Sequence, residues 1–133
     1  MSVEPEYSSY LWERALKSIG TAEKILEDDS DAAANRAYYA AFYAVSALFA
    51  TEGHFFKKHA GVQSELHRQM IHTKRMSREL GDDYDKLLAL RTIADYGAAN
   101  HVTPGNARLC IERARRILEA VHKTLPDVFP LNI

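Results

Sequence analysis

The sequence predicts an all-α fold, an up-and-down bundle of four to five helices. Apolar residues recur at spacings of three and four along most of the chain, which is the period of a helix with one buried face. No stretch shows the alternation of apolar and polar residues that is typical of a β-strand. Short connections separate the helical stretches, and such connections favour antiparallel neighbours. With 133 residues, 47% hydrophobic and 26% charged, the composition is that of an ordinary globular domain.

The first two predicted helices cover residues 7–27 and 31–52. One face of the first helix is apolar at positions that step by three or four, namely Leu11, Ala15, Ile19, Ala22 and Leu26. An acidic cluster ends this helix, and Ser30 or Asp31 is expected to cap the next one by accepting hydrogen bonds from its free N–H groups. The second helix carries aromatic residues separated by alanines, so we expect it at the centre of the bundle.

Two further helices are predicted after a loop at residues 53–61. The third covers residues 62–79 and is the least apolar of the set. Gly81 is expected to break the helical pattern, because glycine is a poor helix former. The fourth helix is expected to begin at Asp82 or at the residue after it, and to end near Asn100.

The fifth predicted helix covers residues 103–125. It begins with Thr103 and Pro104, a capping residue followed by a proline whose missing N–H costs nothing at the first helical position. The tail at residues 126–133 contains two prolines and is expected to be loosely ordered. We expect the whole chain to form a single domain with a core at residues 8–125.

The cysteine content and the apolar runs predict a cytoplasmic protein that does not contact a membrane. Cys110 is the only cysteine, which excludes an internal disulfide and is typical of a reducing compartment. No apolar run approaches the ~20 residues that span a bilayer. The first residues are acidic and lack the basic start and the apolar stretch of a signal peptide.

Charge is unevenly distributed, although the net charge is only −1. Residues 1–31 are rich in acids. Residues 57–78, here named the basic segment, contain Glu65 as their single acid, and their cations are Lys57, Lys58, Arg68, Lys74, Arg75 and Arg78. Such a segment suits a polyanion. It equally suits a solvated face, or a surface that meets the acidic first helix of the same chain or of another copy.

Several kinds of site are excluded by their motifs. The chain has no glycine-rich phosphate loop, no HExxH pattern and no CxxC pattern, and it has no recognisable arrangement for serine nucleophile chemistry. His67 and His72 lie five residues apart, which at ~100° per residue places them off a common helical stripe. We therefore predict neither a bound metal nor a cofactor.

Three segments carry the candidate site. They are NRAYYAAFY at residues 35–43, KKHAGV at residues 57–62 and RTIADY at residues 91–96. In this combination and order the chain resembles the HEPN family, in particular its small stand-alone members with an RAYYAAF, KxHxGV and RxxADY pattern, over residues 10–125. The resemblance implies a helical bundle that usually dimerises and frequently pairs with a minimal nucleotidyltransferase in toxin–antitoxin-like modules. It also implies descent from, or membership of, a group of metal-independent RNases.

The catalytic signature that the resemblance implies is incomplete in this chain. Those RNases carry an arginine followed by a polar residue, with a histidine five to seven positions after the arginine. The histidine would act as general acid/base while the arginine steadies the phosphate charge. Arg91 fits the arginine, but Tyr96, Gly97 and Ala98 occupy the histidine positions, and His101 lies about 80° around the helix from Arg91. We therefore lean against an efficient enzyme.

The candidate site residues come from the same three segments. The candidate catalytic residues are Arg91 and Asp95, which are one helical turn apart and can pair, either as a structural ion pair or as part of a ligand site. The candidate ligand-binding residues are Asn35, Arg36, Lys57, Lys58, His59, Arg91 and Tyr96. Three aromatic residues of the second helix are expected in the core rather than at a ligand: Tyr38, Tyr39 and Tyr43.

Three functions remain open at this point. The first is a HEPN protein that pairs with a nucleotidyltransferase, binds a nucleotide or RNA phosphate and forms a homodimer. The second is a metal-independent RNase toxin with a degenerate motif, using Arg91 with Asp95 or His59. The third is a purely structural dimer without a small ligand.

Two surfaces follow from these expectations. The basic segment and Arg91 are predicted to form one anion-binding surface. The dimer seam is predicted to include the second or the fourth helix, because the second is apolar around more of its circumference than one core-facing stripe requires.

Overall fold

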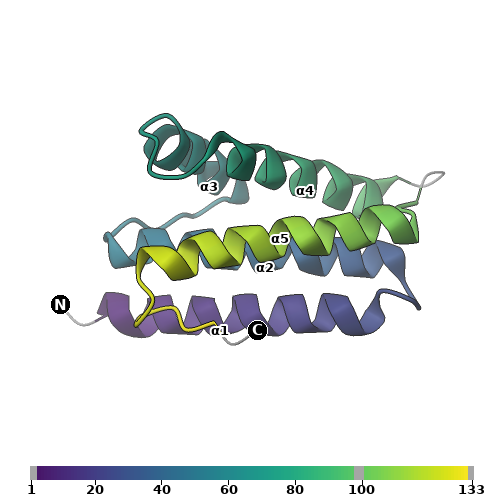
Figure 1. Ribbon diagram of the computed structural model, residues 1–133, viewed down its shortest axis with the longest axis horizontal. Helices are drawn as coiled ribbons and strands as arrows, with labels where there is room; N and C mark the ends of the chain where they lie inside the picture. Colours follow the sequence, from purple (N-terminus) through teal and green to yellow (C-terminus); the bar gives the residue numbers. More distant parts are fainter. Residues whose placement is uncertain (1–2, 98–100, 132–133) are drawn as a thin grey trace.

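The computed structural model describes residues 3–97 and 101–131, and their side chains from residue 6 onward. They form α1 (Val3–Ile25), α2 (Ser30–Thr51), α3 (His59–Glu65), a π-helical segment η1 (Leu66–Ile71), α4 (Arg78–Tyr96) and α5 (Pro104–Thr124). No strand occurs in these ranges. None of their helices has both the length and the apolar character of a membrane span. The predicted all-α helical bundle is confirmed (Figure 1).

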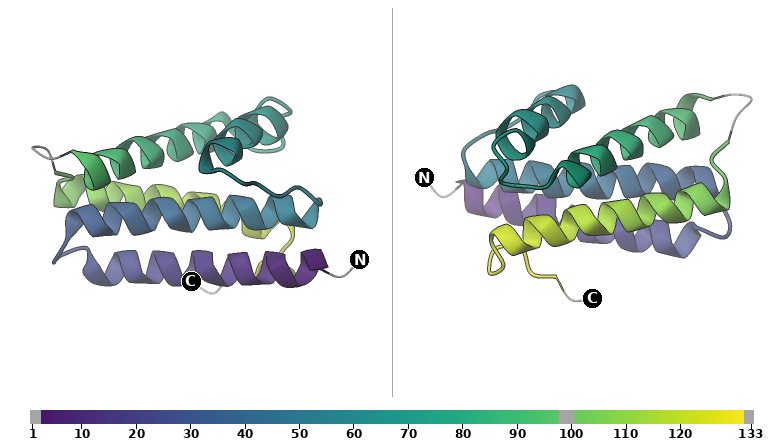
Figure 2. Two further views of the ribbon diagram at one scale, coloured as in Figure 1. Left: turned by 180° about the vertical axis from the view of Figure 1, so that it is seen from behind. Right: turned by 45° about the horizontal axis from the view of Figure 1, so that its top comes forward.

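Helix α2 occupies the centre of the bundle. Figures 1 and 2 show it between α1 on one side and the pair α4 and α5 on the other, with α3 above its C-terminal end. Helices α2 and α4 are antiparallel, because Asn35 contacts Asp95 while Tyr38, further along α2, contacts Tyr84. This packing brings the first turns of α2 to the last turns of α4.

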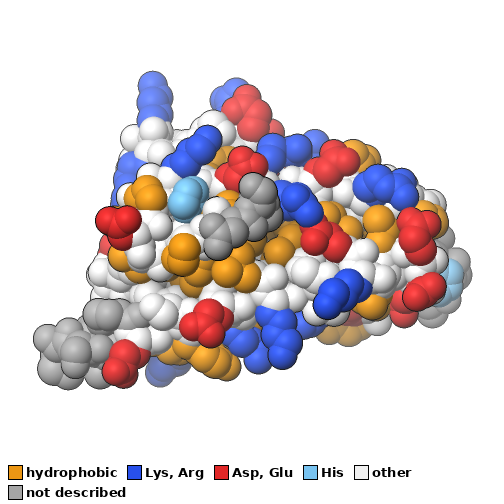
Figure 3. Space-filling view, turned by 60° about the horizontal axis from the view of Figure 1, so that its bottom comes forward, with side chains coloured by type: hydrophobic (Ala, Val, Ile, Leu, Met, Phe, Trp, Pro, Cys, Tyr) orange, Lys and Arg blue, Asp and Glu red, His pale blue; other side chains and the backbone are white. Residues whose placement is uncertain are grey.

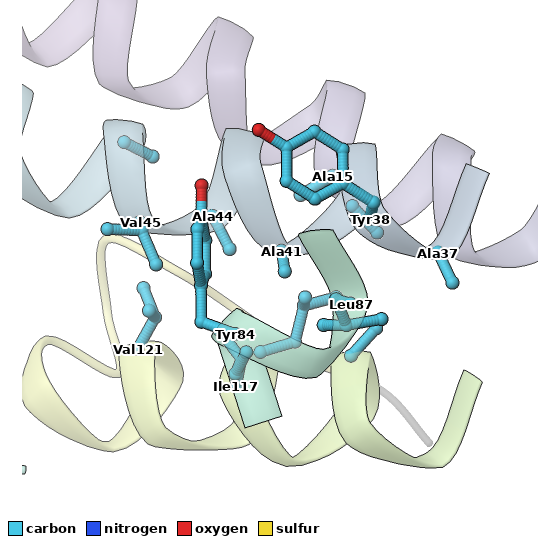
Figure 4. Close-up of a cluster of buried hydrophobic side chains, with 14 of the residues drawn as sticks. Ala15, Ala37, Tyr38, Ala41, Ala44, Val45, Tyr84, Leu87, Ile117 and Val121 are labelled. Atoms are coloured by element: carbon cyan, nitrogen blue, oxygen red, sulfur yellow. The ribbon is translucent and has the colours of Figure 1, made fainter. Parts of the chain in front are cut away.

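The alanines of α2 explain its central position. Most of them are fully buried, and their small side chains let the neighbouring helices approach closely. Figure 4 shows part of this core, where Ala41 and Ala44 lie beside Tyr84 and Leu87 of α4 and Val121 of α5. The alanine face of α2 is therefore covered within one chain, whereas three of its aromatic side chains remain half-buried: Tyr39, Phe42 and Tyr43. The dimer seam expected at α2 or α4 stays a prediction.

The N-terminus of α2 is capped by Asp29, and not by Ser30 or Asp31 as predicted. The Asp29 carboxylate accepts a hydrogen bond of 3.0 Å from the backbone N–H of Ala32. Asp31 lies inside the first turn and accepts a 2.7 Å hydrogen bond from the backbone N–H of Val102. That bond lowers the pKa of Asp31. Asp31 therefore connects the start of α2 to the segment before α5.

The cap gives a first prediction. Replacing Asp29 by Ala is expected to lower the free energy of unfolding by about 1 kcal/mol, because it leaves an N–H group at the start of α2 without its acceptor. Urea unfolding followed by circular dichroism measures the loss. Asp28→Ala is the matched control, since the neighbouring Asp28 is exposed and caps no helix. Equal losses in the two variants would contradict the role of Asp29.

The helix boundaries between α2 and α4 differ from the prediction. The third helix begins at His59, continues as η1 and ends at Ile71, so it is shifted toward the N-terminus of the predicted range. Gly81 does not break a helix but is buried in the first turn of α4. A Cβ at this position would lie 2.7 Å from Cε1 of His67 in η1. The close approach of η1 to α4 therefore explains this glycine.

The connection between α4 and α5 is partly as predicted. Helix α4 ends at Tyr96. The predicted end at Asn100 lies outside the described residues. Helix α5 begins as expected, because the Thr103 hydroxyl accepts a 3.1 Å hydrogen bond from the backbone N–H of Asn106 and Pro104 is the first helical residue.

Residues 126–131 pack on the bundle, although we predicted a loosely ordered tail. Phe129 is fully buried, and its ring centroid is 5.2 Å from that of Trp12. The indole N–H of Trp12 donates to the carbonyl oxygen of Pro130 at 2.8 Å. His122 Nδ1 lies 2.6 Å from the carbonyl oxygen of Phe129. On the face of α1 and α5 that this segment crosses, acidic, basic and hydrophobic side chains are interspersed (Figure 3).

Candidate functional site

The three sequence segments of the candidate site meet at the seam between α2 and α4. The start of α2, the first residue of α3 and the end of α4 contribute seven residues, here named the Arg91 cluster: Asn35, Arg36, Tyr39, His59, Arg91, Asp95 and Tyr96. The antiparallel packing of α2 on α4 brings these segments together.

Arg91 and Asp95 form the charged centre of the cluster. Arg91 Nε lies 2.8 Å from Asp95 Oδ2, in a direction that makes the contact an ion pair rather than an aligned hydrogen bond. The amide nitrogen of Asn35 donates to both carboxylate oxygens, at 3.1 and 3.2 Å. The side chain of Arg91 is 18% exposed and that of Asp95 is 24% exposed. Because both carboxylate oxygens are engaged, Asp95 is better suited to positioning Arg91 than to accepting a proton.

Tyrosine rings surround the Arg91 guanidinium. Its central carbon lies 5.5, 5.4 and 5.9 Å from the ring centroids of Tyr38, Tyr39 and Tyr96. These distances are within the range of cation–π attraction. Arg91 Nη2 also donates to the Tyr39 hydroxyl at 3.0 Å. Tyr38 is fully buried, as predicted, whereas Tyr96 is 72% exposed and gives the cluster an aromatic surface toward solvent.

A second guanidinium, that of Arg36, lies against the same Tyr39 ring as that of Arg91. Arg36 Nε and Nη2 donate to the Asn35 side-chain oxygen at 3.0 and 2.8 Å. The guanidinium carbon of Arg36 is 4.9 Å from the ring centroid of Tyr39. Asn35 therefore connects Arg36 to Asp95. Among the described residues, none accepts a hydrogen bond from Nη1 of Arg36 or of Arg91, so both arginines keep donors for a ligand.

His59 completes the cluster from the start of α3. Its ring centroid is 4.2 Å from that of Phe42 and 5.5 Å from that of Tyr39. Partial burial of the ring lowers the pKa of His59, and the positive charge of Arg91 lowers it further. The imidazole is therefore neutral at pH 7 and can accept a proton. As a whole the residue remains exposed, so a ligand can reach it.

Three basic residues considered from the sequence lie outside the cluster. Lys57 and Lys58 are exposed in the loop before α3, where they precede His59 in the chain without contacting Arg91 through any hydrogen bond or ion pair within the described ranges. His101 follows the end of α4, and its Nδ1 lies 2.7 Å from Asp31 Oδ2. It does not take the place of the missing RNase histidine.

Three contributors to this surface are not predicted by the sequence. Tyr39 and Tyr43 are half-buried at the edge of the cluster, although we expected both in the core. Arg14 of α1 donates from Nη2 to the Tyr43 hydroxyl at 2.9 Å and lies 5.0 Å from the Tyr43 ring centroid. Because the partners come from different helices, spacing within one helix does not reveal these pairs.

The arrangement has the chemistry of a phosphate site. Guanidinium groups bind phosphate through charge-assisted hydrogen bonds, and exposed aromatic rings stack on bases. Within the part of the chain that the structure describes, no three His, Cys, Asp or Glu side chains gather to hold a metal ion. The fold and the cluster together define a class: small helical bundles with an arginine–carboxylate–tyrosine site between two antiparallel helices.

Known proteins place the chain in a family. The model of the HEPN domain matches residues 8–124. A UPF0332 protein of Thermotoga maritima is 32% identical over 129 residues, which cover 96% of this chain and 98% of that protein. "Putative toxin MJ0142" of Methanocaldococcus jannaschii is 30% identical over 116 residues, which cover 86% of this chain and 79% of that protein. The chain therefore belongs to the HEPN domain family, as the resemblance of its three segments predicts.

Proposed function

We propose that this protein is the HEPN component of a toxin–antitoxin-like module, that it pairs with a minimal nucleotidyltransferase, and that it binds a nucleotide or RNA phosphate at the Arg91 cluster. The observation that carries the phosphate site is that Arg36 and Arg91 both lie against the Tyr39 ring, with Nη1 groups that lack acceptors among the described residues. The exposed ring of Tyr96 adds a surface on which a base can stack. The name of the relative from Methanocaldococcus jannaschii, "Putative toxin MJ0142", supports the module.

In this function the cluster holds its ligand and presents it to the partner without rapid catalysis. Asp95 is engaged by Asn35 and Arg91, so it is poorly placed to take a proton from a ribose hydroxyl. The position five residues after Arg91 holds Tyr96, which cannot replace an imidazole as general acid/base near neutral pH.

Binding is tested with fluorescently labelled single-stranded RNA and a labelled nucleotide, measured by anisotropy across a salt series. We expect affinity to fall steeply as salt rises, because phosphate contacts release counterions. Lys57→Ala and Lys58→Ala are each expected to weaken binding modestly and to reduce the salt dependence, because both exposed lysines directly precede His59 and add positive charge near the cluster. No binding to either probe at low salt would contradict the proposal.

The partner is tested through the neighbouring gene. An adjacent short reading frame with the nucleotidyltransferase Gly-Ser…Asp-x-Asp pattern, whose product co-purifies with this chain, is the expected result. Failure of the two co-expressed chains to co-purify would contradict the pairing and would leave the binding of phosphate to be judged by the anisotropy measurements.

A second candidate function is a metal-independent RNase, and His59 is the observation that favours it. Its imidazole is neutral, exposed and close enough to Arg91 for the arginine charge to lower its pKa. Such a group can act as general base while Arg91 steadies the phosphate. RNA cleavage in EDTA that is lost in His59→Gln would put this function first. The third candidate, a structural dimer without a ligand, requires that no phosphate ligand binds the cluster.

We also predict a homodimer whose seam includes part of α4. The end of α4 exposes two large hydrophobic side chains, Ile93 at 38% and Tyr96 at 72%. Light scattering at micromolar concentration is expected to give twice the 15.0 kDa of one chain. Ile93→Lys is expected to shift the species toward the monomer, because it places a charge in the seam. A single 15.0 kDa species for the wild type would contradict the prediction.

A further inference from the structure

A second site lies at the other end of α4. A cavity of about 590 Å³ opens where η1, the turn after it and the start of α4 meet. Its volume falls within the range of pockets that hold small ligands. The side chains that give it its chemical character are His67, His72, Lys74, Arg78 and Asp82.

The backbone around this cavity departs from regular geometry at several points. Residues Leu66–Ile71 form a π-helix, a rare conformation that often occurs at functional sites. Lys74 has a φ of 64°, in the left-handed region that side chains other than glycine seldom adopt. Gly81 lets His67 approach α4 closely. His67 is fixed there by a 2.9 Å contact between its Nε2 and Asp85 Oδ1. The wall of the cavity is therefore held in an unusual shape.

Ion pairing separates the cations of the basic segment into two groups. Arg68 pairs with Glu65, and hydrogen bonds from Arg68 and Gln69 lower the pKa of Glu65 to about 2. Arg75 pairs with Glu52 at 2.8 Å. These two arginines are therefore neutralised at the surface.

The cations that line the cavity are not neutralised in this way. Within the described ranges, neither Lys74 nor Arg78 makes an ion pair or a side-chain hydrogen bond, and Asp82 is the single acid of the lining. Ser77, the residue before α4, makes no capping hydrogen bond with its hydroxyl, which leaves that donor for a ligand. The cavity therefore combines an excess of positive charge with several hydrogen-bond donors.

The cavity is distinct from the Arg91 cluster. Arg78 and Arg91 belong to the same helix, and at 1.5 Å per residue they are about 20 Å apart along its axis. The prediction that the basic segment and Arg91 form one anion-binding surface is therefore wrong for Lys74 and Arg78. These two residues face a cavity of their own.

We propose that this cavity binds the phosphate group of a nucleotide-sized phosphate monoester. The guanidinium of Arg78 offers paired N–H donors that match two phosphate oxygens, and the ammonium of Lys74 adds a point charge. His72 supplies a further donor, and the remaining volume takes the organic part of the ligand. Neither this ligand nor its site depends on the function proposed for the Arg91 cluster.

Isothermal titration calorimetry with AMP and with inorganic phosphate tests this site. Two variants remove its charge: Arg78→Gln, and Lys74→Gly, which also suits the left-handed backbone at that position and should keep the fold. The titrations are made in the Arg91→Gln variant, so that AMP bound at the Arg91 cluster does not contribute to the signal. In that background we expect AMP to bind more tightly than inorganic phosphate, and the added double change to weaken AMP binding at least tenfold. Arg75→Gln is the matched control, because it removes the same charge from the same turn without touching the cavity, and it should change affinity less than twofold.

Arg91→Gln separates the two sites. AMP should still bind to the Arg91→Gln variant. Adding the Lys74 and Arg78 changes to that variant should abolish the binding. The proposal is overturned if AMP does not bind, if the added double change leaves its binding unaltered, or if inorganic phosphate binds as tightly as AMP. Circular dichroism of each variant, unchanged from the wild type, shows that a loss of binding is not a loss of fold.

Discussion

Replacing Arg91 by Gln is expected to weaken binding of single-stranded RNA by about tenfold to a hundredfold. A charge-assisted hydrogen bond contributes ~1.5–3 kcal/mol, and ~1.4 kcal/mol corresponds to a factor of ten in affinity. The loss should be largest at low salt, because one phosphate contact fewer also reduces the counterion release. Anisotropy measured between ~50 and ~200 mM salt gives both the affinity and the slope.

The control for this prediction is Arg108→Gln. Arg108 lies on α5, is exposed, and pairs with Glu27, so its replacement changes the net charge equally without altering the cluster. Arg91→Lys is expected to fall between the wild type and Arg91→Gln, since lysine keeps the charge but loses the paired donors. Equal losses in Arg108→Gln and Arg91→Gln would mean that binding follows overall charge, which contradicts the assigned site.

Replacing Tyr96 by His is expected to create metal-independent RNase activity in a protein that otherwise lacks it. The change places an imidazole five residues after Arg91, and general acid/base help is typically worth ~10²–10⁴-fold in rate. Tyr96 is largely exposed, and its ring lies 5.9 Å from the guanidinium carbon of Arg91, so the new side chain reaches the cluster at little cost in stability. Cleavage of a labelled RNA in EDTA measures the gain.

Val128→His is the matched control for this gain. It also puts an imidazole in place of an exposed hydrophobic side chain, but in the C-terminal segment whose Phe129 packs on Trp12 of α1, outside the Arg91 cluster. Equal activity in the two variants would indicate a contaminating or non-specific nuclease. If the wild type already cuts RNA well in EDTA, the metal-independent RNase becomes the first candidate function. Loss of that cutting in Asp95→Asn or in His59→Gln then identifies the base.

The fold follows from the sequence where periodicity and caps agree. Thr103 and Pro104 mark the start of α5 as expected, because a cap followed by proline is a local signal. Gly81 was predicted as a break and lies inside α4, because a glycine required by the close approach of His67 has the same local pattern as one that ends a helix. Trp12 and Phe129 fix the C-terminal segment through a contact between distant parts of the chain, which no local pattern encodes.

The candidate site follows from the sequence only in part. The spacing of Arg91 and Asp95 predicts their pairing, and the structure has it. The contact of Asn35 with Asp95 joins two helices, so it depends on the antiparallel packing of α2 on α4, which the spacing within either segment does not encode. The separation of Lys74 from the Arg91 cluster was not predicted, because a run of charges along the chain does not say which of its members face solvent, an acid or a cavity.

The most direct test of the account is nuclear magnetic resonance of the Arg91 cluster during titration with RNA. The Nε–H signal of Arg91, assigned by its loss in Arg91→Lys, is observed together with the imidazole signals of His59. We expect both to shift and to saturate at the affinity measured by anisotropy, since the phosphate binds between these residues. Binding detected by anisotropy while both sets of signals stay unchanged would contradict the assignment of the phosphate site to this cluster.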